Sequence, residues 1–107
     1  MLKHPPAQSV FARRLREARL RADLPQDRLG VMIGLDEASS SARMSRYETG
    51  VHEPPFPIIA KIAKALQVPV AYFFCADDRL AEIMRTYFSA DENTRQAMFD
   101  AVIALGG

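Results

Sequence analysis

The chain has one cysteine, no tryptophan and two histidines among its 107 residues. A single thiol cannot form an intrachain disulfide, which suits a protein of a reducing compartment. No apolar run approaches the roughly 18–20 residues of a membrane span, and the first residues lack the apolar stretch of a signal peptide. His4 and His52 have no partners at metal-ligand spacing. We therefore expect a cytoplasmic protein with no metal, no cofactor and no membrane association.

Alternating apolar and polar residues, typical of strands, are also missing, and no internal repeat is present. Apolar residues recur at helical spacing instead, so we predict an all-α fold. A chain of this length can bury one small helical core and little else. Neither a nucleophile with its base nor a glycine-rich phosphate loop is visible, so we expect no enzymatic activity.

Five helices are predicted in the first three quarters of the chain from apolar spacing and capping residues. They cover residues 9–21, 25–33, a third helix that begins between 37 and 41 and ends at 49, 57–67 and 70–74. Ser9 is the expected cap of the first helix. Pro25 and Pro57 suit first-turn positions, and Gly34 and Gly50 are the expected stops.

Two further helices are predicted near the C-terminus. Asp77 or Asp78 is the expected cap of the first, whose apolar stripe consists of Leu80, Ile83, Met84, Tyr87 and Phe88. The spacing of Ser89 and Glu92 is that of a capping box, which predicts the start of the second helix there. This last helix is expected to end at Gly106 and Gly107.

Residues 97–105 are apolar on nearly all sides, whereas a surface helix should be apolar on one stripe only. The segment is therefore either sandwiched in the core or shared with another subunit. We favour the shared alternative, because five helices already close a small core. The expected dimer contacts are Met98, Phe99, Val102, Ile103 and Leu105.

The charge is unevenly spread along the chain. Residues 1–67 carry 11 Lys and Arg against 7 Asp and Glu, whereas residues 68–107 carry 3 against 6. A basic first part can face a polyanion, and an acidic second part would stay away from one.

The segment at residues 43–50 reads Arg-Met-Ser-Arg-Tyr-Glu-Thr-Gly. In a helix, Met44 and Tyr47 would be buried together, while Arg46 would lie on the opposite face with Ser41 and Ala42. Glu48 would lie at the helix end, where a carboxylate opposes the helix dipole unless a cation meets it. Arg19 is the candidate cation.

These residues belong to a set that resembles the Cro/repressor-type helix-turn-helix family, also called the xenobiotic-response-element family. The matching segments are residues 11–19, 26–29, 44–50 and 62–68, together with Gly34 and Pro54. The resemblance implies a five-helix lambda-repressor-like DNA-binding domain over residues 9–75. It leaves an N-terminal arm over residues 1–8 and a C-terminal helical extension over residues 76–107, which we expect to dimerise.

The resemblance also implies roles by position. Gln26 corresponds to a residue that contacts the DNA backbone or a base edge. The positions expected to face bases are Ser41, Ala42 and Arg46, and those expected to face phosphates are Arg43 and Thr49. Arg19 and Glu48 correspond to a partly buried structural ion pair. The segment between Gly34 and Met44 is longer than the family pattern, so we add Ser40 as a candidate DNA contact.

The implied function is sequence-specific binding of duplex DNA through a recognition helix over about residues 38–49. We expect a transcriptional repressor that acts as a homodimer on a palindromic operator in the bacterial nucleoid. Two alternatives remain open at this point. One is an antitoxin that binds both DNA and a toxin protein, and the other is a protein-interaction module that has lost DNA binding.

Overall fold

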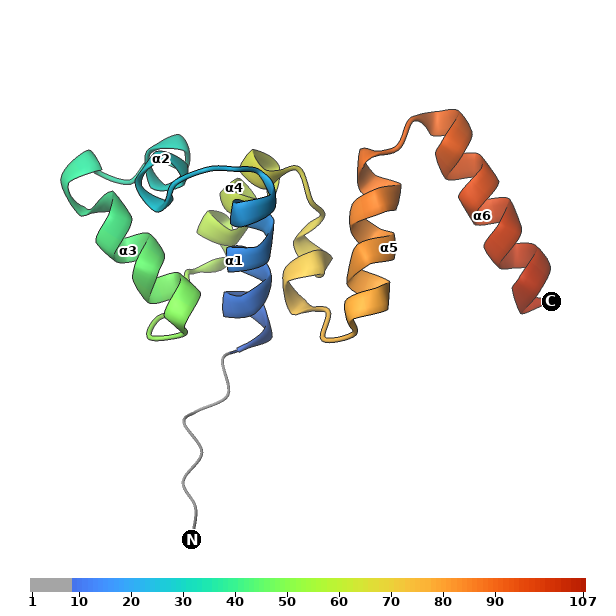
Figure 1. The fold of residues 1–107 in the computed structure, drawn as a ribbon, viewed down its shortest axis with the longest axis horizontal. Helices are drawn as coiled ribbons and strands as arrows, with labels where there is room; N and C mark the ends of the chain where they lie inside the picture. The colour runs from blue at the N-terminus through green and yellow to red at the C-terminus, as the bar shows by residue number, and fades with distance from the viewer. Residues whose placement is uncertain (1–8) are drawn as a thin grey trace, which may run out of the picture.

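A computed structural model describes residues 9–107, and within this range the secondary structure is entirely helical. The elements in chain order are α1 (Val10–Arg21), α2 (Gln26–Met32), α3 (Glu37–Thr49), α4 (Phe56–Leu66), the 3-10 helix η1 (Val70–Phe74), α5 (Asp78–Ser89) and α6 (Glu92–Gly106) (Figure 1). The predicted all-α fold, with two helices after the first five, is confirmed. The arm predicted over residues 1–8 lies outside the described residues. None of the described helices is long and apolar enough to cross a membrane.

Local sequence explains where the first helices begin and end. The Ser9 hydroxyl oxygen accepts a hydrogen bond from the Ala12 amide at 3.0 Å, which caps α1 as predicted. Gly50 has a φ of 81°, a left-handed conformation that ends α3 and that glycine adopts without strain. Pro25 precedes α2 as its N-cap, one position earlier than predicted, and Pro57 is the second residue of α4.

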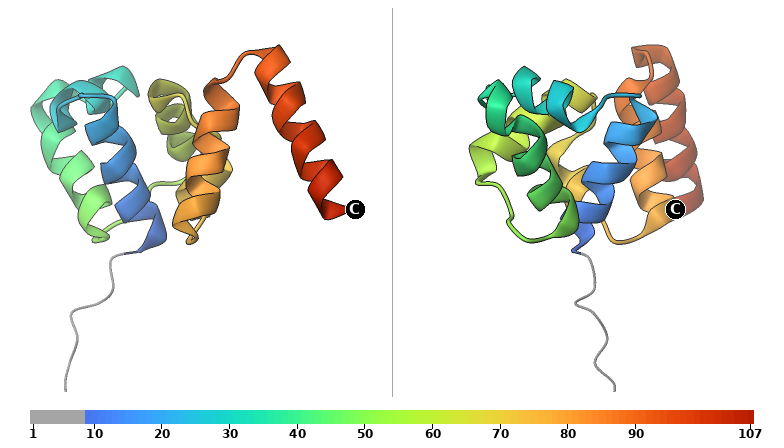
Figure 2. Two further views of the ribbon diagram at one scale, coloured as in Figure 1. Left: turned by 45° about the vertical axis from the view of Figure 1, so that its right-hand side comes forward. Right: turned by 60° about the vertical axis from the view of Figure 1, so that its left-hand side comes forward.

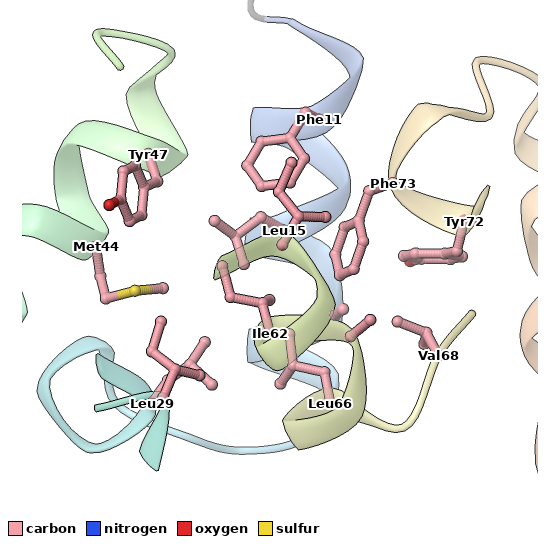
Figure 3. Packing of buried hydrophobic residues seen from close by; sticks show 14 of the residues in the cluster. Phe11, Leu15, Leu29, Met44, Tyr47, Ile62, Leu66, Val68, Tyr72 and Phe73 are labelled. Carbon is pink, nitrogen blue, oxygen red and sulfur yellow. The ribbon is translucent and has the colours of Figure 1, made fainter. Parts of the chain in front are cut away.

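The core lies between α1, α3, α4 and η1, and α2 closes it from one side (Figure 3). Its buried members come from each of these helices and include Phe11, Leu15, Leu29, Met44, Tyr47, Ile62, Leu66 and Phe73. The spacing of Leu29, Met32 and Ile33 in the sequence predicts that all three face this core, but Met32 is 53% exposed. It is the last residue of α2, and the chain turns away immediately after it at Gly34, which has a φ of 92°.

Helices α2 and α3 approach each other closely where Gly30 faces Ser40. The Ser40 side chain is fully buried, and its hydroxyl donates a hydrogen bond to the Asp27 carbonyl at 2.7 Å. The prediction that Ser40 contacts DNA is therefore wrong. Its hydroxyl satisfies a backbone acceptor inside the protein, and the absence of a side chain at Gly30 makes room for it.

Gly30→Ala is expected to destabilise the fold by about 1–3 kcal/mol, because overpacking outweighs the roughly 1 kcal/mol gain in helix propensity. A Cβ atom at Gly30 would lie 1.9 Å from the Ser40 Oγ and 3.3 Å from the Met44 Cγ. Gly106→Ala is the matched control, since a Cβ there meets nothing within 4 Å. Chemical denaturation of the two variants tests the difference. Equal stabilities would show that α2 and α3 can separate at no cost.

The C-terminal helices extend away from this core. Helix α5 packs against η1, and α6 lies beyond α5, at the opposite end of the molecule from α3 (Figures 1 and 2). Helix α6 contains no buried residue. The predicted capping box is wrong, because Ser89 is the last residue of α5 and its hydroxyl donates to the Arg85 carbonyl. Asp91 caps α6 instead, accepting a hydrogen bond from the Thr94 amide at 2.8 Å.

Arg14 joins the core to the C-terminal extension. The sequence favours a solvated face for the arginines of α1, because they lie mostly off its apolar stripe, but the Arg14 side chain is only 2% exposed. Its Nε donates to the Cys75 carbonyl at 2.9 Å, and its Nη2 lies 2.8 Å from the Asp78 carboxylate. Hydrogen bonds from Arg13 and Arg14 hold the pKa of Asp78 below its usual value. This contact ties the start of α5 to α1, so Arg14 is unavailable to DNA phosphates.

Candidate nucleic-acid interface

Helix α3 presents one face to the core and the other to solvent. Met44, Tyr47 and Glu48 are buried, whereas Ser41, Ala42, Arg43, Arg46 and Thr49 are exposed. The structure therefore gathers five of the predicted DNA-facing residues on one accessible helix surface. An exposed α-helix of this width fits the major groove of duplex DNA.

Among residues 9–107, the arginines on this surface form no ion pair. In the described part of the chain, Arg43 and Arg46 form no ion pair within 4.0 Å, and neither does Arg28 on α2. Arg13, Arg14 and Arg19 of α1, by contrast, all meet carboxylates. Arg28, Arg43 and Arg46 thus place three unpaired cations on α2 and α3, where a polyanion could supply the missing charge. Arg28 was not among the predicted DNA contacts, because its exposure on α2 is evident only in the structure.

The predicted ion pair is present and buried. The Arg19 guanidinium contacts the Glu48 carboxylate through Nε, and its Nη2 lies 3.0 Å from the Glu48 Oε1. Arg19 is 7% exposed and Glu48 2% exposed. Arg19 also donates to the Leu24 carbonyl at 2.8 Å. The pair therefore connects α1, the turn before α2 and the C-terminal end of α3.

Gln26 belongs to the same network. Its Nε2 donates to the Glu48 Oε1 at 3.1 Å, and the residue is half-buried at the first position of α2. Glu48 thus fixes the Gln26 side chain beside the exposed face of α3. The Thr49 hydroxyl donates to the Ser45 carbonyl at 2.9 Å, so a phosphate contact by this hydroxyl would replace an internal bond.

The sequence of this chain matches a known protein family. Residues 10–72 match the family described as a helix-turn-helix domain. The chain belongs to this family. It is a Cro/repressor-type helix-turn-helix protein, and its function is DNA-binding regulation of transcription. The match indicates a family of DNA-binding regulators rather than of enzymes.

Two relatives extend the similarity beyond the matched domain. The chain is 28% identical over 101 residues to the cryptic phage CTXphi transcriptional repressor RstR of Vibrio cholerae, covering 90% of this chain and 87% of the relative. It is 36% identical to the transcriptional regulator BswR, whose crystal structure superposes with a TM-score of 0.83. That match covers 87% of this chain and 92% of the other. The similarity therefore extends well past residue 72.

The C-terminal helices form a second surface of different chemistry. A groove of about 260 Å³ between α5 and α6 is lined by Ile83, Met84, Tyr87, Met98, Phe99 and Val102. The predicted apolar stripe of α5 was expected to pack, but Ile83 is 53% exposed and Leu80 is 45% exposed. The predicted dimer contacts on α6 are exposed as well, with the exception of half-buried Met98. Of the predicted dimer contacts, Met98, Phe99 and Val102 line this groove, whereas Ile103 and Leu105 are exposed outside it.

Proposed function

We propose that this regulator is a homodimeric transcriptional repressor that reads a palindromic operator through α3. The observation that carries the proposal is the unpaired Arg43 and Arg46 on the exposed face of a helix whose other face is locked into the core. A protein of this kind acts at the nucleoid of the bacterial cytoplasm. The named relative RstR is a transcriptional repressor, which supports repression as the sign of regulation.

In the proposed complex, one set of side chains contacts base edges and another contacts the DNA backbone. Arg46, with Ser41 and Ala42, faces base edges, because a guanidinium can donate two hydrogen bonds to guanine and a small apolar side chain can contact a thymine methyl group. Arg43 and Thr49 lie toward the backbone, where they set the register of the helix. Gln26, held by Glu48, approaches the backbone or a base edge from the start of α2.

We place the dimer contact on α5 and α6, within a C-terminal extension over residues 76–107 that is distinct from the DNA-binding domain over residues 9–75. The occupant of the apolar groove is a second copy of the chain. A two-fold interface uses the same patch on both subunits, so an apolar face can cover its own equivalent. In each chain α6 lies at the opposite end of the molecule from α3 (Figure 2), so a dimer contact through α6 would leave both recognition helices accessible.

Arg46→Ala is expected to weaken binding to the preferred operator by about 1–3 kcal/mol and to change binding to random duplex much less. The physical reason is the loss of hydrogen bonds to a base edge. Arg79→Ala is the matched control, since Arg79 is an exposed arginine of α5 that forms no ion pair with any other described residue. Fluorescence anisotropy on operator and random duplexes measures both affinities. Equal losses on the two duplexes would make Arg46 a phosphate contact.

The salt dependence of binding to random duplex separates the proposal from a protein-interaction module of the same fold. Contacts to several phosphates give a steep decrease of the logarithm of the affinity with the logarithm of the salt concentration. A module without DNA binding would give no measurable affinity at any salt concentration.

A further inference from the structure

A hollow of about 320 Å³ lies beside the C-terminal half of α3, where the chain turns toward α4. Arg43, Arg46 and Tyr47 line it from α3, and His52 and Glu53 line it from the following loop. The remaining walls are two consecutive prolines. None of the roles assigned above to the recognition helix uses the loop residues of this hollow.

The backbone holds His52 at this place. Gly50 ends α3 in a left-handed conformation, and the His52 amide then donates to the Arg46 carbonyl at 3.3 Å. Pro54 is buried, and Pro55 precedes the first residue of α4. The loop is thus fixed at both ends, and the imidazole stays on the same side of the molecule as the exposed face of α3.

The charges that face the hollow favour an anion. They are the guanidinium groups of Arg43 and Arg46, the carboxylate of Glu53, the phenol of Tyr47 and the imidazole of His52. Neither arginine has an ion-pair partner in the described part of the chain. With His52 neutral, these side chains sum to one positive charge, and protonation of His52 adds a second.

We propose that this hollow receives one backbone phosphate of the bound duplex and that protonated His52 is one of its ligands. DNA binding by this regulator therefore strengthens as the pH falls through the range in which histidine titrates. The inference rests on the proposed function, because it requires α3 to lie in the major groove. It assigns His52 a binding role and makes the DNA affinity dependent on pH.

The direction of the pH dependence follows from the linkage between proton binding and phosphate binding. A phosphate beside the imidazole stabilises the protonated form, so the complex binds more protons than the free protein at neutral pH. Affinity must then rise as protons are added, until His52 is protonated in the free protein too. Arginine stays charged throughout this range, so Arg43 and Arg46 contribute equally at both ends of it.

The composition of the chain makes the experiment simple, because His4 and His52 are its two histidines. Affinity for a fixed duplex is measured at about pH 6 and about pH 8 at constant ionic strength. The proteins are the natural chain, His52→Gln and, as the matched control, His4→Gln. We expect the natural chain and His4→Gln to bind about 3- to 10-fold more tightly at the lower pH.

His52→Gln is expected to bind as the natural chain does at the higher pH and to lose the gain at the lower pH. Its salt slope at the lower pH should also be smaller by about 0.9 for each protomer. Thermal melting checks that the variant is folded. A gain that persists in His52→Gln, or no gain in the natural chain, overturns the inference.

Inorganic phosphate added at matched ionic strength identifies the source of the anion. We expect it to leave the pH effect unchanged. If it abolishes the effect, the hollow binds free phosphate, and the assignment to the DNA backbone is wrong. If the natural chain binds no duplex at either pH, the proposed function fails together with the inference. If it binds at both without a pH effect, only the inference fails.

Discussion

Phe99→Asp and Val102→Asp are each expected to convert the regulator from a dimer into a folded monomer. Phe99 is 54% exposed and Val102 62% exposed, and both line the apolar groove between α5 and α6. A carboxylate on this face would have to be buried without a partner in the proposed dimer, which costs several kcal/mol. The monomer should lose much less by the change, because in it both residues are more than half exposed to water.

The effect on DNA binding should be large. Two linked recognition helices bind a palindromic site more tightly than one by a factor on the order of 10²–10⁴, so most of this gain should be lost. Sedimentation velocity measures the oligomeric state, and anisotropy on the operator measures the affinity. Helix content measured by circular dichroism should not change.

Asn93→Asp is the control for the added charge, since Asn93 is exposed in the first turn of α6 and does not line the groove. It should remain dimeric. If Phe99→Asp and Val102→Asp also remain dimeric with full affinity, the contact between subunits lies elsewhere and the placement of the interface on α6 is wrong.

Glu48→Ala is expected to reduce the free energy of unfolding by about 3–5 kcal/mol, because it leaves the Arg19 guanidinium buried without its partner. Glu48 is 2% exposed and accepts hydrogen bonds from Arg19 and Gln26. Its loss would also release the Gln26 side chain at the start of α2. The change is therefore expected to affect folding first and DNA contact second.

Chemical denaturation of Glu48→Ala, Arg19→Ala and the double variant measures the coupling between the two residues. We expect the double variant to be less destabilised than the sum of the single effects. Glu37→Ala is the control, since Glu37 is an exposed carboxylate in the first turn of the same helix. It should cost only about 0.3–1 kcal/mol through the helix dipole. Simple additivity for Arg19 and Glu48 would refute the coupling.

Much of the fold could be predicted because local signals and burial agree. The spacing of Phe11 and Leu15 identifies the buried side of α1, and Ser9 marks its start. The Arg19–Glu48 pair was predictable because a carboxylate at a helix C-terminus needs a cation. These features depend on residues within one helix, or on one strong electrostatic requirement.

The errors arose where the answer depends on a distant partner. Arg14 is buried because the Cys75 carbonyl and the Asp78 carboxylate meet it, and no spacing within α1 indicates either group. Ser40 is buried because Gly30, on another helix, leaves space for it. A serine in a helix is predicted to lie on the surface unless the residue that faces it on the neighbouring helix is known.

The apolar stripe of α5 could be predicted only in part, for a different reason. Its periodicity correctly predicted the helix α5, but Leu80 and Ile83 remain exposed within one chain. A pattern of apolar residues states which side of a helix avoids water, without stating whether the same chain or a second copy covers it. His52 was considered only as a metal ligand, because its closeness to Arg46 depends on the turn at Gly50.

Selection of bound duplexes from a random pool tests the central claim most directly. The account predicts enrichment of an inverted repeat whose half-site centres are about one helical turn, roughly 34 Å, apart or a multiple of it. Arg46→Ala should relax the preference at one position in each half-site. Enrichment of a single asymmetric half-site would contradict binding of the operator by a dimer. No enrichment over the starting pool would contradict sequence-specific binding altogether.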